Sequence, residues 1–309
     1  MKNYWVLFLL SVFVFPQTSF ADTKEDEATA LTPSEDKIEA PKIDDTTNNR
    51  MKTLEGSRSR FSGQFNISYQ GSTISHPFSD TAPNLSGITP PPLVTLSGLV
   101  SARYRIDAVT TTGIGTGITT QTPFQGPKNT TVSEPYMDIA RTYTFNKIHN
   151  RADFQVTLYT SDEYHNQFGY REELSISNES SYLFPFGLTV GFLLELDYNF
   201  FSGSSTYSTA TATNAVLSNQ TQWDLITDPF FEYTLTRSLN LRTVIGIQSY
   251  NNRNLASDFA LVHPSIYETL GVGCQILPSW FIYPFVQFFP GKVESANTVV
   301  GFNTIINLF

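Results

Sequence analysis

The chain has 309 residues and a formal net charge of −9, with 14% aromatic and only 15% charged residues. The acidic balance argues against a nucleic-acid partner, because no basic stripe is present that could neutralise phosphates. The single cysteine, Cys274, excludes an internal disulfide. Many aromatic residues combined with abundant Gly, Ser, Thr and Asn favour strands that have one apolar face and one wet face.

Residues 1–21 have the form of a secretory signal peptide. Lys2 precedes an apolar core, and Ser19 and Ala21 place small side chains where a signal peptidase cleaves. After this segment no run of 18 apolar residues occurs, so a chain that crosses a membrane must do so with strands. The sequence therefore predicts export, with the mature chain beginning near Asp22.

Residues 22–58 form an acidic tail. Between Asp22 and Arg50 there are nine acidic and four basic residues, two prolines and almost no large apolar groups. Such a composition buries too little surface to offset the entropy of ordering. We expect a disordered tail, and a periplasmic partner that binds it is an open alternative.

Residues 59–309 repeat one theme, which is an alternating run of about ten residues followed by a turn. The clearest run, 188–199, alternates large apolar residues with Thr189, Gly191, Glu195 and Asp197. This period of two is typical of strands with one apolar face. The runs predict twelve strands, at 61–69, 93–105, 108–119, 134–145, 151–160, 170–182, 188–199, 223–235, 239–247, 261–276, 280–289 and 298–309.

The last run ends on an aromatic residue. One face carries Val300, Phe302, Thr304, Ile306 and Leu308, and the other carries Gly301, Asn303, Asn307 and Phe309. This run resembles the closing strand of bacterial outer-membrane β-barrels. The resemblance implies an all-β, transmembrane, antiparallel up-and-down barrel of about twelve strands in the outer membrane of a Gram-negative bacterium. It also implies that lipid surrounds the barrel and that the barrel-assembly machinery recognises Phe309.

The strand number and loop lengths set the expected orientation. An even number of strands puts both ends of the barrel on the periplasmic side, where the predicted turns are short. The architecture resembles the twelve-stranded porins, such as the nucleoside-specific and oligogalacturonate-specific channels. This resemblance implies passive diffusion of small hydrophilic solutes through a narrow lumen. A non-conducting structural barrel, with long loops at 72–92 and 201–219 that bind a partner, is the alternative.

Strand alternation also predicts which charged side chains face inward. They comprise eight acids and three arginines, so a conducting lumen should prefer cations. Asp197, Asp224 and Asp228 are expected to crowd near the extracellular end, or else to lie in water or pair with arginines. The side chains predicted to line the lumen are Arg103, Asp138, Asp153, Arg171, Glu173, Glu195, Asp197, Asp224, Asp228, Glu232 and Arg242.

The turn at 236–238 predicts a specific register. If it is centred on Arg237, Glu232 and Arg242 face each other on the lumenal side. The same register places Phe231 opposite Thr243 on the lipid side. A slip of one residue would turn one strand's charges into the hydrocarbon.

Two residues offer an enzymatic alternative. His263 and Ser265 lie two apart on one predicted strand, after a loop that contains Asn251, Asn252 and Asn254. This spacing is similar to the His and Ser pair of the outer-membrane phospholipase family, but the flanking residues of that family are absent. No metal-binding or phosphate-binding motif is present, so neither a cofactor nor catalysis is predicted.

Overall fold

The computed structural model describes residues 59–83, 94–126, 128–132, 134–161, 165, 169–202, 221–252 and 262–308. The predicted signal peptide, the whole of the predicted acidic tail and Phe309 lie outside these residues and stay predictions. None of the helical segments in the described ranges is long and apolar enough to cross a membrane.

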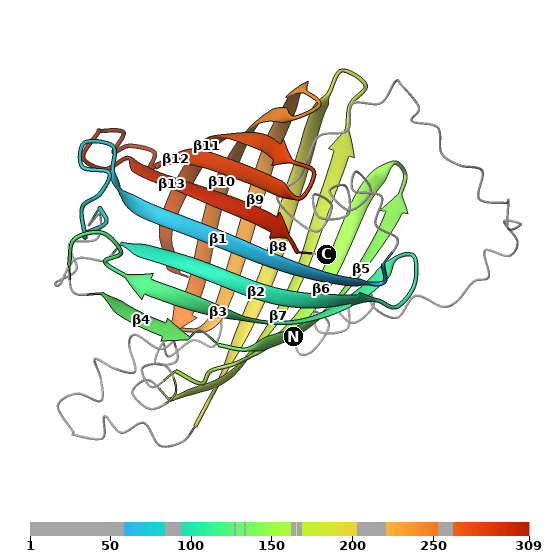
Figure 1. Ribbon diagram of the computed structural model, residues 1–309, viewed down its shortest axis with the longest axis horizontal. Helices are drawn as coiled ribbons and strands as arrows, with labels where there is room; N and C mark the ends of the chain where they lie inside the picture. The colour runs from blue at the N-terminus through green and yellow to red at the C-terminus, as the bar shows by residue number, and fades with distance from the viewer. Residues whose placement is uncertain are drawn as a thin grey trace, which may run out of the picture. The chain divides into compact units, whose positions relative to one another are not determined.

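The described residues form one antiparallel sheet of thirteen strands. The strands are β1 (Phe61–Thr73), β2 (Thr95–Arg105), β3 (Thr110–Gln121), β4 (Asn129–Val132), β5 (Tyr136–Phe145), β6 (Ile148–Leu158), β7 (Tyr170–Leu183), β8 (Leu188–Phe201), β9 (Thr221–Thr236), β10 (Leu239–Asn252), β11 (Val262–Leu277), β12 (Trp280–Phe288) and β13 (Val299–Asn307). In Figure 1 the blue β1 lies alongside the red β13, at the two ends of the colour scale.

The sheet closes on itself. β1 pairs with both β2 and β13, and β3 pairs with β2 on one side and with β5 and β4 on the other. β4 continues the line of β5 along β3, so the wall contains twelve strands and the predicted number is confirmed. Closure leaves the wall without a free edge, which is what a strand structure needs in lipid.

β4 lies between the predicted strands 108–119 and 134–145, where the sequence predicted no strand. Ile118 pairs with Val132, whereas Gly115 pairs with Tyr136, so the register shifts by one residue between β4 and β5. Pro135 lies at this shift and has no N–H to give to a ladder. Its carbonyl still accepts a hydrogen bond from the Leu158 amide at 2.9 Å. Pro135 therefore lies where β4 ends and β5 begins, two strands that both pair with β3.

Short turns join the strands at one end of the barrel. In the turn between β2 and β3, the Asp107 carboxylate accepts hydrogen bonds from the amides of Val109 (2.8 Å) and Thr110 (2.7 Å). The bond from Val109 is the main reason why the pKa of Asp107 lies below its usual value. The other short turns occupy 146–147, 184–187, 237–238 and 278–279.

The turn between β5 and β6 is tighter than the predicted 146–150. Asn146 and Lys147 both have positive φ, 48° and 68°. Two such residues in succession are typical of a type I′ hairpin, which matches the twist of the flanking strands. β6 therefore begins at Ile148, three residues earlier than predicted.

Replacing Lys147 with Gly should stabilise the barrel by about 1 kcal/mol, because a left-handed residue other than Gly costs about 1 to 2 kcal/mol. The free energy of unfolding in urea, measured on the barrel refolded into lipid, checks this. Lys147→Ala is the control, since it removes the charge and keeps the Cβ. Equal stability of the two variants would contradict the assigned backbone strain.

The outer face of the wall is apolar. Side chains such as Ile114, Phe192 and Leu270 are 63%, 42% and 43% exposed, although they belong to the interiors of long strands. This exposure fits a barrel whose solvent on that side is hydrocarbon. On β13, Val300 and Phe302 belong to the outer face, and Asn303 lines the cavities inside.

Thr304 is the polar exception on the outer face of β13. Its hydroxyl donates to the carbonyl of Phe281 and accepts from Trp280 Nε1, at 2.7 Å in each case. The indole covers it, and Thr304 is only 5% exposed. A hydroxyl with both bonds made can lie on a lipid-facing strand at little cost.

The predicted register of β9 and β10 is confirmed. Glu232 pairs with Arg242, and Phe231 pairs with Thr243. The nearest carboxylate and guanidinium atoms, Glu232 Oε2 and Arg242 Nη1, are 3.8 Å apart. Both side chains face the interior of the barrel.

Candidate functional site

Two cavities inside the barrel, lined by described residues, adjoin each other. The larger, of about 830 Å³, is called here the polar cavity, and the smaller, of about 620 Å³, the aromatic cavity. Both are lined by Ser68 of β1 and Asn303 of β13, whose side chains share a hydrogen bond of 2.7 Å. The two cavities therefore meet at this pair.

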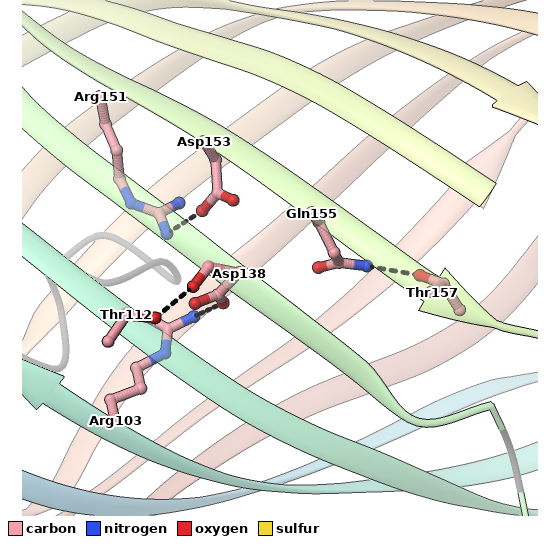
Figure 2. A network of polar contacts seen from close by, with 7 residues as sticks. All are labelled: Arg103, Thr112, Asp138, Arg151, Asp153, Gln155 and Thr157. Carbon is pink, nitrogen blue, oxygen red and sulfur yellow. Dashed lines mark hydrogen bonds and ion pairs between the residues drawn. The ribbon is translucent and has the colours of Figure 1, made fainter. Parts of the chain in front are cut away.

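Ion pairs line one wall of the polar cavity (Figure 2). Arg103 of β2 reaches across β3 to Asp138 of β5, with Nη2 and Oδ2 3.2 Å apart. This reach depends on Gly113 of β3, which pairs with both residues and has no side chain between them. The Asp138 side chain is only 4% exposed, so its charge is neutralised within the wall.

A second ion pair joins two residues of β6. Arg151 Nη2 lies 2.6 Å from Asp153 Oδ2, and two positions along one strand place both on the lumenal face. Arg151 was absent from the predicted lumenal set, because the turn before it was expected to extend to Asn150. Further along β6, Gln155 Nε2 donates to the Thr157 hydroxyl at 3.1 Å.

Acids dominate the neighbouring part of the wall, on β7 and β8. Glu173 of β7 and Glu195 of β8 both line it, and the Tyr159 hydroxyl donates to Glu173 at 2.7 Å. Asp197 is 8% exposed and pairs in register with Asp224 of β9. The structure thus brings two of the three predicted crowding acids together.

The remaining predicted residues lie elsewhere. Asp228 pairs with Leu193 and lines the aromatic cavity, as does Arg242. Glu232 is fully buried beside Arg242. Arg171 is exposed and lies at a register shift of β7, and it lines neither cavity.

Glu179 is a lumenal acid that the predicted set omits. It pairs with Arg151 and lines the aromatic cavity. Its position was available from alternation, since it lies six residues from Glu173 on the same strand and therefore on the same face.

Five aromatic side chains contribute to the wall of the aromatic cavity. They are Phe230 of β9, Tyr267 of β11, and Tyr283, Phe285 and Phe289 of β12 or just after it. Arg242 stacks its guanidinium carbon 4.6 Å from the centre of the Phe230 ring, and the Tyr283 hydroxyl donates to the Arg242 carbonyl at 3.2 Å. Sequence reasoning missed this wall.

Four of these five rings each cover a glycine of a neighbouring strand. A Cβ at Gly246 would occupy the place of the Tyr267 ring, and one at Gly191 the place of the Phe230 ring. The same holds for Tyr283 over Gly271 and Phe285 over Gly301. Covering a glycine lets a large ring lie along the wall instead of filling the lumen.

No cluster of metal-binding side chains occurs among the described residues. His263 and Ser265 belong to β11, and Ser265 pairs with Gln248. The described residues do not include Asn254, and they include no side-chain placement for His263, Ser265, Asn251 or Asn252. The hydrolase alternative therefore stays a prediction.

Comparison with known proteins gives structural likeness only. No family model matches the chain, and no curated protein matches it. The COG4313 outer membrane channel from Pseudomonas putida F1 superposes with a TM-score of 0.53 at 9% identity, covering 81% of this chain and 97% of that one.

Two further matches are weaker. The NanC porin has a TM-score of 0.44 at 7% identity, covering 79% of this chain and 98% of that one. The translocator domain of the autotransporter NalP from Neisseria meningitidis has a TM-score of 0.41 at 11% identity, covering 85% and 94%. The fold, together with the apolar outer face, makes the chain a transmembrane β-barrel of the outer-membrane type, as predicted.

Proposed function

We propose that the barrel is an outer-membrane channel for the passive diffusion of small hydrophilic solutes, with a preference for cations. The observation that carries this proposal is the charge balance inside the wall. Arg103, Arg151 and Arg242 each have an acid partner, at 3.2, 2.6 and 3.8 Å. The acids beyond these pairs give the lumen its net negative field.

The strand number supports a narrow path. Eight-stranded barrels are filled by their side chains, whereas sixteen strands leave an open aqueous channel. A twelve-stranded wall lies between these limits, and this one retains two adjoining cavities. A lumen of this kind suits small, positively charged solutes that keep most of their hydration water.

In planar bilayers we expect discrete conductance steps and a reversal potential of cation-selective sign under a KCl gradient. Replacing Glu195 with Gln and Asp228 with Asn together should shift the reversal potential towards zero, because each change removes an acid that lines a cavity. Glu294→Gln is the matched control, since Glu294 is an exposed residue between β12 and β13.

Two outcomes would contradict the proposal. An anion-selective reversal potential would refute the cation preference. The absence of any steps from correctly folded barrel would favour the alternative of a non-conducting structural protein.

A further inference from the structure

We propose that the aromatic cavity is a binding site for organic cations that carry an aromatic or similarly bulky apolar group. As a substrate class for the channel this rests on the proposed function, whereas binding itself can be measured without conduction. The structure offers such a ligand an apolar wall and an acid on the same cavity.

The rings provide the surface for the apolar group. Phe230, Tyr267, Tyr283 and Phe285 line one cavity of about 620 Å³, a size in the range of small-molecule sites. Because the rings lie over glycines of the wall, their faces rather than their edges bound the cavity. The face of an aromatic ring carries the negative end of its quadrupole and attracts cations.

Arg242 already shows that this surface accepts a cation. Its guanidinium lies over the Phe230 ring, at 4.6 Å from the ring centre. The protein's own cation occupies that ring, and the fully buried Glu232 balances its charge. Tyr267 and Phe285 offer further rings in the same cavity.

Asp228 provides the charge for the ligand. It lines the aromatic cavity, and its Oδ1 has no hydrogen-bond partner among the described residues. Two acids, Glu179 and Asp228, line this cavity against one base, Arg242, whose charge the buried Glu232 also balances, so the lining is net negative. These carboxylates would repel an anion, and a purely apolar molecule would gain nothing from their charge.

The connection between the cavities supplies an approach. Ser68 and Asn303 border both spaces, so a cation in the acid-lined polar cavity is one side-chain pair away from the rings. Acids along the approach raise the local concentration of a positively charged ligand.

The test uses the full mature chain in a non-ionic detergent and measures binding by titration calorimetry. Benzyltrimethylammonium is the probe. Three comparators each change one property: tetramethylammonium has no ring, benzyl alcohol has no charge, and benzenesulfonate has a negative charge. We expect saturable binding of benzyltrimethylammonium and at least about tenfold weaker binding of each comparator.

Matched variants locate the site. Asp228→Asn should weaken binding of the probe about tenfold and Phe285→Leu about threefold. The controls are Glu294→Gln, which removes an exposed acid between β12 and β13, and Phe231→Leu, which removes a ring 43% exposed on the outer face. Both controls should keep the wild-type affinity.

Equal affinity for all four probes, or no saturable binding by the folded wild type, would overturn the inference without any variant. Binding that survives Asp228→Asn in folded protein would also overturn it. Specific binding by a barrel that shows no conductance would support the site and refute the channel. Conductance without specific binding would support the channel and refute the binding site.

Discussion

Replacing Arg242 with Met should lower the free energy of unfolding of the barrel by about 3 to 5 kcal/mol, since it leaves an uncompensated charge in the wall. Glu232 is 0% exposed, and Arg242 is its charged neighbour at 3.8 Å. Methionine keeps much of the volume of the arginine stem, so the loss reports the charge rather than a cavity. Urea unfolding of the barrel refolded into lipid measures it.

The pair also predicts a partial rescue. Glu232→Leu combined with Arg242→Met should be more stable than Arg242→Met alone, because apolar pairs of similar volume replace buried ion pairs at little cost. Arg105→Met is the control, because Arg105 is exposed at the end of β2 and a surface change is usually worth less than about 0.5 kcal/mol. A loss below about 1 kcal/mol for Arg242→Met would contradict the burial of the pair.

Replacing Gly246 with Val should reduce single-channel conductance strongly, because the new side chain takes the place of the Tyr267 ring. The ring must then leave the wall and project into the aromatic cavity. The change should also destabilise the barrel by about 1 to 3 kcal/mol, which is the usual cost of overpacking. Conductance in planar bilayers and urea unfolding measure the two effects.

Gly98→Val is the control, since a Cβ there would meet Phe65 at 3.4 Å, an ordinary contact. It should leave conductance unchanged. Adding Tyr267→Ala to Gly246→Val should restore conductance, because no ring is left to be displaced. Wild-type conductance of Gly246→Val alone would refute the ring packing described here.

Alternation was sufficient to predict the wall and much of its chemistry. In β9 and β10 the charged pair of Glu232 and Arg242 and the apolar residue Phe231 agree on one register, so a slip would have cost several interactions at once. Where one face of a strand is apolar and the other is charged, a period of two in the sequence identifies both faces. The predicted strand number was right for the same reason.

β12 shows where that reasoning fails. In its sequence, WFIYPFVQF, both the odd-numbered and the even-numbered residues are mostly apolar. Alternation therefore cannot tell an inner face from an outer one. In the structure Tyr283 lies over Gly271 and Phe285 over Gly301, which identifies these two rings as inward-facing. Glycines on the strands beside an aromatic strand were the available signal.

Local turn chemistry explains the other omission. The turn of Asn146 and Lys147 lacks the glycine that usually marks a two-residue hairpin, so β6 was predicted to start three residues late. Arg151 was then the first residue of the predicted strand and was not counted among the lumenal residues.

The pairing of β1 with β13 determines how the barrel can be built. Every other neighbouring pair in the wall forms between strands adjacent along the chain, with β4 as a short continuation of β5, whereas the Ser68 to Asn303 hydrogen bond joins residues 235 positions apart. Closing a flexible loop of that length costs about 3 kcal/mol more than closing one of ten residues. We therefore expect the eleven local strand pairs to form before the seam. Until the seam closes, the incomplete sheet exposes two edges, one on β1 and one on β13, and the pairing of these two strands removes both.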